Sequence, residues 1–146
     1  MSTWPDEKIW ILALRHIRER SMDPDQWLYT RLGEWDERIA YDPHAAERPL
    51  VVTFVSTSSW SVFTTRRIAG SLDGSSFNIS PLDVVDHRWG TDPKAVRGES
   101  IGTAELDLHD RTVVRFEFEA GKAWMGPIHA IRFWMIKHPV LDNLTV

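Results

Sequence analysis

The chain has 146 residues, of which 42% are hydrophobic and 26% charged, a composition that suits one folded domain with its own core and excludes wholesale disorder. A net charge of −4 provides no broad positive surface, so we expect no binding of nucleic acid. The chain contains no cysteine, which excludes disulfides, thiolate metal sites and cysteine nucleophiles.

No stretch of the sequence approaches the roughly 20 apolar residues of a membrane span, and no basic segment with a following apolar run opens it. We therefore expect a cytoplasmic protein without a membrane span. The eight tryptophans are an unusually large number for this length. Each buried indole needs a partner for its N–H group, so some are expected at the margin of the core or at a contact surface.

The first 48 residues predict a helical N-terminal extension made of two helices. Residues 4–20 begin with a proline and two acids and end with several arginines, an arrangement that suits the helix dipole. Apolar residues recur on one side of this segment and predict a face that packs on another part of the protein.

The second expected helix begins near Asp23, which resembles an N-cap followed by Pro24 in the first turn. Apolar residues then fall at helical spacing, namely Leu28, Leu32, Trp35 and Ile39. We expect the helix to be broken somewhere after Gly33 and closed at residues 42–43. Over residues 27–32 a strand remains an open alternative, because so short a segment does not fix the period.

From residue 49 onward the sequence predicts antiparallel strands. Residues 50–57 and 60–69 are rich in β-branched side chains and are expected to pair. Asp73-Gly74 is a strong hairpin signal. Residues 103–109 and 112–120 alternate between apolar and polar side chains and form the clearest antiparallel pair.

Residues 127–138 predict a C-terminal helix, with a buried strand over residues 130–136 as the open alternative. The expected order is thus two helices, six or seven strands and one helix. This order predicts a single α+β domain over residues 1–146, with the antiparallel core in residues 49–146.

Ser100 lies in "GESIG", which matches the G-x-S-x-G pattern of a nucleophile elbow. That elbow requires a strand before the serine and a helix after it. Here a charged loop precedes the motif and an alternating strand follows it, so we interpret Ser100 as a loop residue between turn glycines. A small hydrolase using Ser100 is kept as the second alternative function.

Asp107 and His109 share the outward face of one expected strand, and Glu117 on the neighbouring strand could join them as a metal ligand. No pair of histidines has the spacing of a recognised zinc site. We therefore favour a solvated, charged face here and expect neither a metal nor a cofactor.

Arg66 and Arg67 form the most conspicuous basic pair. Adjacent side chains of a strand point to opposite faces, so these two residues cannot grip one anion unless the strand ends or bulges there. Trp89 precedes the polar loop of residues 90–102, and loops of this length are uncommon unless they are disordered or functional. Trp89 is therefore a candidate contact anchor, with a core position at a strand end as the alternative.

Four phrases, "WSVFTTRRIAGSLDG", "FNISPLDVVDHRWG", "TAELDLHDRTVVRFEFEAG" and "IHAIRFWMIKHP", resemble bacterial pleckstrin-homology-like domains over about residues 50–138. Residues 64–68 are similar to one characteristic phrase of that family, and Ile79 with residues 82–85 to another. The resemblance implies a bent antiparallel sheet or partly open barrel, closed at one end by the C-terminal helix. Two N-terminal helices are a departure from that pattern.

The leading functional hypothesis is a small non-enzymatic binding module, of the adaptor or immunity type, that contacts a protein partner. It would use a sheet edge, the loop 90–102 and exposed tryptophans such as Trp89. The alternative is a lipid or phosphoanion binder, as the resemblance implies for relatives, with charge supplied by Arg66, Arg67, Lys94 and Arg97. A homodimer is also left open.

Overall fold

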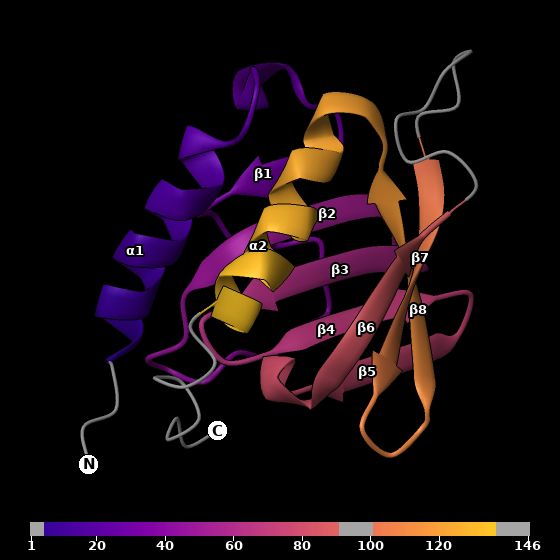
Figure 1. Cartoon of the computed structure of the whole chain (residues 1–146). Helices are drawn as coiled ribbons and strands as arrows, with labels where there is room; N and C mark the ends of the chain where they lie inside the picture. The colour runs from indigo at the N-terminus through magenta and orange to yellow at the C-terminus, as the bar shows by residue number, and fades with distance from the viewer. Residues whose placement is uncertain (1–4, 91–100, 137–146) are drawn as a thin grey trace.

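The computed structural model describes residues 5–90 and 101–136, which form an α+β fold with one α-helix on each side of a run of strands in the sequence (Figure 1). The helices are α1 (Asp6–Glu19) and α2 (Met125–Ile136). The strands are β1 (Thr30–Leu32), β2 (Pro49–Ser56), β3 (Ser59–Thr64), β4 (Ile68–Leu72), β5 (Ser75–Ile79), β6 (Val84–Trp89), β7 (Ile101–Leu108) and β8 (Val113–Glu119). Short 3-10 helices cover Pro24–Gln26, Pro81–Asp83 and Gly121–Trp124.

The strands form two antiparallel sheets in which each strand pairs with the next one in the chain. The first sheet has five strands in the order β1-β2-β3-β4-β5, and the second has three in the order β6-β7-β8. Figure 1 shows the three-stranded sheet crossing in front of one end of the five-stranded sheet, with α1 and α2 beside it on the same side. β8 contacts β3 and β4, while α2 contacts both α1 and β2.

The main core lies between the five-stranded sheet on one side and the helices and the second sheet on the other. Strand alternation decides which side chains enter it, because successive residues of a strand point to opposite faces. The residues in the main core include Val51, Phe63 and Ile68 from the first sheet, Leu106, Phe116 and Phe118 from the second, and Ile9, Ile17, Ile131 and Phe133 from the helices. Their neighbours Val52, Val62 and Ala69 face the opposite, outer side of the five-stranded sheet.

The prediction of a second N-terminal helix is wrong. Asp23 has a φ of 50°, which differs from the extended backbone of an N-cap residue, and only a short 3-10 helix follows it. Thr30–Leu32 pairs with β2, so the strand alternative is correct for this part of residues 27–32. Residues 33–48 contain no helix or strand. The first 48 residues are therefore not wholly helical, since β1 belongs to the five-stranded sheet.

The other expected elements are mostly confirmed. The hairpin at Asp73-Gly74 joins β4 to β5, with positive φ at both residues, and the β7–β8 pair has the expected partners. Residues 130–136 are helical, which settles the alternative left open there. The single strand expected over residues 60–69 is wrong, because a turn after Thr64 divides it into β3 and β4.

Among the described residues, no helix combines the length and the apolar character that crossing a bilayer requires.

Candidate functional site

A second, smaller apolar cluster lies on the outer face of the five-stranded sheet. Residues 33–48 supply Ile39 and Tyr41 to it, although they form no regular element. From the sheet, it contains Val52, Phe54, Trp60, Val62 and Ala69. The irregular segment is thus fixed to the sheet by side-chain packing.

Three aromatic rings form a connected row on this cluster. The ring centroids of Trp35 and Tyr41 are 6.0 Å apart with an interplanar angle of 29°, a stacked pair. Tyr41 in turn meets Trp60 edge-on at 6.5 Å. Trp60 is buried, but 39% of Trp35 is exposed, so the row runs from the sheet to the surface.

Arg38 lies in the same region in a fixed position. Its guanidinium donates from Nε and Nη2 to the two carboxylate oxygens of Asp36, at 2.9 Å and 2.6 Å. The guanidinium carbon also lies 4.1 Å above the centre of the Phe54 ring, a cation–π arrangement. The hydrogen bonds from Arg38 lower the pKa of Asp36, so this carboxylate stays charged and keeps the arginine in place.

Glu47 holds the hydroxyl of Tyr41, the middle ring of the aromatic row. It is only 5% exposed, and its carboxylate accepts hydrogen bonds from the hydroxyls of Tyr41 and Thr64 and from the backbone N–H of His44. The distance from the Tyr41 hydroxyl is 2.6 Å. Burial, together with the nearby Glu47 charge, raises the pKa of Tyr41, so this hydroxyl remains a donor at neutral pH.

We call the set Trp35, Arg38, Tyr41, Phe54 and Trp60 the aromatic patch. A surface hollow of about 580 Å³ adjoins it, lined by Arg31, Trp35, Asp36, Glu37 and Arg38. Charged groups of both signs therefore surround an exposed indole. This combination of an aromatic anchor and a polar rim is typical of protein contact sites.

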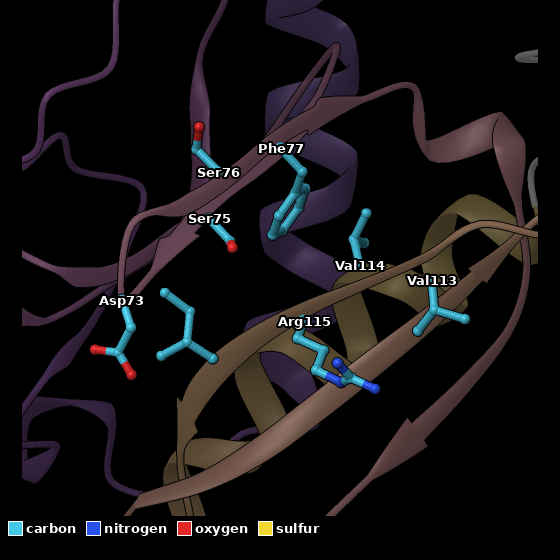
Figure 2. Close-up of a pocket in the computed structure, with 8 residues that line it drawn as sticks. Asp73, Ser75, Ser76, Phe77, Val113, Val114 and Arg115 are labelled. Carbon is cyan, nitrogen blue, oxygen red and sulfur yellow. The ribbon is translucent and has the colours of Figure 1, made fainter.

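A second hollow, of about 410 Å³, lies between the β4–β5 hairpin and the start of β8 (Figure 2). In Figure 2, Ser75 and Phe77 point from β5 toward β8, whereas Ser76 points away. Val114 lies opposite Phe77, and 43% of Val113 is exposed. The groove thus runs along β5, the last strand of the five-stranded sheet.

Arg66 and Arg67 lie in the turn between β3 and β4, so the strand does end at the basic pair. Arg66 already has a partner within the chain: it donates two hydrogen bonds of 2.9 Å to the carboxylate of Asp6. Arg67 is half-buried. Its positive charge partly offsets the rise in the pKa of Tyr41 that burial and Glu47 cause. The other two candidate cations, Lys94 and Arg97, lie outside the described residues.

Trp89 ends β6 and is packed against the main core. Its ring meets Phe118 edge-on at 5.0 Å and Phe116 at 5.8 Å. Its Nε1 donates a 2.8 Å hydrogen bond to Nδ1 of His87, and burial lowers the pKa of His87, which favours the neutral ring that can accept this bond. Trp89 is therefore half-buried, between a core residue and a surface one.

The candidate metal ligands do not converge. Asp107 accepts a 2.6 Å hydrogen bond from Arg88, and Glu117 accepts one from the hydroxyl of Ser59. His109 is exposed in the turn after β7. Within residues 5–90 and 101–136 no three His, Asp or Glu side chains are placed to hold a metal ion. Ser100 lies outside these ranges.

The sequence interpretation missed the aromatic patch, because it assigned Trp35 to the face of an expected helix. The sequence signals available were Gly33 and Asp42-Pro43, residue types that often end regular elements. In the structure Gly33 has a φ of 75°, and the segment between these positions has no regular structure. An irregular segment that carries Trp, Arg and Tyr side chains indicates a surface with a contact role.

No protein-family model, curated protein or solved structure matches this chain. Its function must therefore be argued from its own residues.

Proposed function

We propose that this protein is a small non-enzymatic module, of the adaptor or immunity type, that binds a protein partner through the aromatic patch. The observation that carries this proposal is that Trp35 is both exposed and packed against another ring. Its indole is 39% exposed, yet it is held by stacking on Tyr41.

The residue types of the aromatic patch support a protein partner. Trp, Tyr and Arg are the residues most enriched among those that dominate the energy of protein interfaces. Trp35 and Arg38 are already fixed before binding, by Tyr41 and by Asp36. Binding through fixed side chains costs less conformational entropy than ordering free ones, so this surface suits a specific contact.

The surroundings of Arg66 favour a protein over a phosphoanion as the ligand. Arg66, the cation best placed in the β3–β4 turn, has both guanidinium hydrogen bonds directed to Asp6. An incoming phosphate would meet the negative charge of that carboxylate beside the guanidinium. The structural partners of Asp107 and Glu117 likewise support a non-enzymatic role for the charged face of β7 and β8.

We also propose that the β framework is pleckstrin-homology-like. Apart from α1 and β1, the chain passes through β2–β5, then β6–β8, and then α2. This order of successive hairpins and a terminal helix is the one that the resemblance implies. In Figure 1 α2 lies over the same side of the five-stranded sheet as the second sheet, which supports a closing role for it.

Affinity capture tests the proposed function. Tagged wild-type protein and the Trp35→Ser variant are used as baits in lysate of the source cells, and the captured proteins are quantified by mass spectrometry. We expect a protein that the wild type enriches to be lost with Trp35→Ser. The matched control is Met22→Ser, which removes a side chain that is 56% exposed and lies outside the aromatic patch.

Equal capture by the wild type and by Trp35→Ser would contradict the proposal. Vesicles containing phosphoinositides test the lipid alternative, because binding that falls steeply with salt indicates an anionic ligand. Labelling of the purified protein by a fluorophosphonate probe would instead support the hydrolase alternative and Ser100.

A further inference from the structure

Of the strands that the structure describes, four lie at sheet edges, and three of these carry features that hinder pairing with another chain. β1 has only three residues. β6 contains a bulge between Val84 and Asp86, and β8 carries Arg115 and Glu117. Short length, bulges and charges are the usual means by which proteins protect a sheet edge.

The fourth edge, β5, has none of these features. Its residues are Ser75, Ser76, Phe77, Asn78 and Ile79, so it contains no charge and no proline. Its pairing with β4 is regular from end to end, without a bulge. A regular, uncharged and exposed edge is a template on which another strand can pair.

The hydrogen bonds at the two ends of the β3–β4 pair show which backbone groups of β5 are free. Asp73 donates from its backbone N–H to the carbonyl of Ser58, and Thr64 donates to the carbonyl of Arg67. The odd-numbered positions 67 and 73 therefore bond toward β3. Because bonding alternates along an antiparallel strand, the even-numbered residues of β4 bond toward β5.

The partners of those even-numbered residues are Ser75, Phe77 and Ile79. The intervening residues, Ser76 and Asn78, therefore direct their N–H and C=O groups away from β4. No backbone hydrogen bond joins either of them to another described element. Both residues are exposed, so their backbone groups are open to an incoming strand.

We infer that β5 pairs with β5 of a second copy of this chain, antiparallel and centred on Phe77. In this register Ser76 of one copy faces Asn78 of the other, and the same pair recurs on the other side of the two-fold axis. Each pair exchanges two N–H···O bonds, which satisfies every free backbone group of these residues. The strand brings no charge that would repel its own copy.

The groove of Figure 2 provides room for this pairing. The second copy's β5 would lie beside the first, and its inward-facing side chains would enter the groove over Val113 and Val114. The two five-stranded sheets would become one continuous sheet. An edge pair of this length makes a small interface, so we expect a dissociation constant on the order of 100 μM.

Sedimentation velocity over a range of protein concentrations tests the inference. We expect wild-type protein to pass from monomer to dimer as its concentration rises. Ser76→Pro removes the outward N–H donor but no bond to β4, and it should weaken the dimer at least about tenfold. Ser76→Ala keeps that N–H and is the matched control, which should dimerise as the wild type does.

Asn78→Lys is a second variant, which adds to β5 the kind of charge that protects other sheet edges, and it should also weaken the dimer. Circular dichroism confirms that each variant is folded. Wild-type protein that stays monomeric at about 1 mM overturns the inference, as does a dimer that persists in both folded variants. Trp35→Ser should leave the dimer unchanged, so this result and the partner-capture result are independent.

The register is tested by cysteine pairing, because the chain has no cysteine of its own. A mixture of Ser76→Cys and Asn78→Cys proteins should form a disulfide-linked dimer faster than either protein alone, since facing residues of a bonded pair lie within disulfide reach. Equal rates in the mixture and in the separate proteins would contradict pairing centred on Phe77.

Discussion

Asp6 and Arg66 join α1 to the turn between β3 and β4 through two parallel hydrogen bonds of 2.9 Å. The Asp6 carboxylate also accepts a 2.6 Å bond from the hydroxyl of Thr65. Burial acts to raise the pKa of Asp6, but the hydrogen bonds from Arg66 and Thr65 outweigh it and the pKa is lowered. The pair is therefore charged at neutral pH and fixes the start of α1 on the five-stranded sheet.

Replacing Arg66 by alanine should lower the free energy of unfolding by about 1–3 kcal/mol, because the mostly buried Asp6 carboxylate loses its two charged donors. Urea denaturation at pH 7 measures the change. The matched control is Lys122→Ala, which breaks the exposed pair with Asp23 and should cost less than about 0.5 kcal/mol. Equal losses in the two variants would contradict a structural role for the Asp6–Arg66 pair.

His129 on α2 should make the protein less stable in acid. The residue is 8% exposed, and burial, together with the charges of Arg132, His16 and Arg20, lowers its pKa from 6.5 to about 4. The unfolded chain therefore binds a proton at higher pH than the folded chain does. Stability from this group is complete above about pH 6.5 and is lost as pH falls to about 4, by at most about 3 kcal/mol.

Thermal unfolding from pH 7 to pH 4 measures this dependence, and His129→Leu should flatten it. His109→Gln is the control, because His109 is exposed in the β7–β8 turn. A steep loss of stability that remains in His129→Leu would show that other groups cause the acid sensitivity.

Gly102→Ala should lower the free energy of unfolding by about 1–3 kcal/mol, because β7 has no space for a methyl group at this position. A Cβ atom there would lie 2.6 Å from Cζ of Phe118, its cross-strand partner. Phe118 is fully buried and packs on Trp89, so it cannot move away. Chemical denaturation measures the loss, and Thr103→Ala at the next, exposed position should change stability by less than about 0.5 kcal/mol.

Glu119→Ala should loosen β1. The Glu119 carboxylate accepts hydrogen bonds from the backbone N–H groups of Leu28 and Tyr29, at 2.7 Å and 2.8 Å, and is 6% exposed. Without it we expect a loss of about 1–3 kcal/mol in the free energy of unfolding. Hydrogen exchange should also become faster at Thr30–Leu32 than in β3. Unchanged exchange in β1 would contradict this role, and Glu34→Ala, at an exposed residue, is the control.

The sequence predicted most elements whose signals are local. The Asp73-Gly74 turn, the alternation in β7 and β8 and the proline-initiated α1 each depend on neighbouring residues, and each is present in the structure. The prediction of a second helix was wrong because contacts with distant parts of the chain determine the conformation of that segment. Glu119, 91 residues away from Leu28, takes the backbone N–H that a helix would have used.

The aromatic patch could be predicted only in part. The tryptophan count indicated that some indoles reach the surface, but not which ones, because exposure depends on packing between distant segments. Trp60 is buried under Tyr41 and the irregular segment, while Trp35, only six residues before Tyr41, remains partly exposed. Trp35 and Ile39, whose spacing suggested a helical face, instead lie in an irregular segment. There Trp35 stacks on Tyr41, and Ile39 packs in the same apolar cluster as Tyr41.

The contact between α1 and α2 has a consequence for synthesis on the ribosome. The sheets connect neighbours in the chain, so each hairpin can close soon after it emerges from the exit tunnel. α1 emerges first of the described elements, but the helix that covers part of its apolar side is translated last among them. During translation that side stays open to water and to chaperones, so the nascent chain is most prone to aggregate just before α2 emerges.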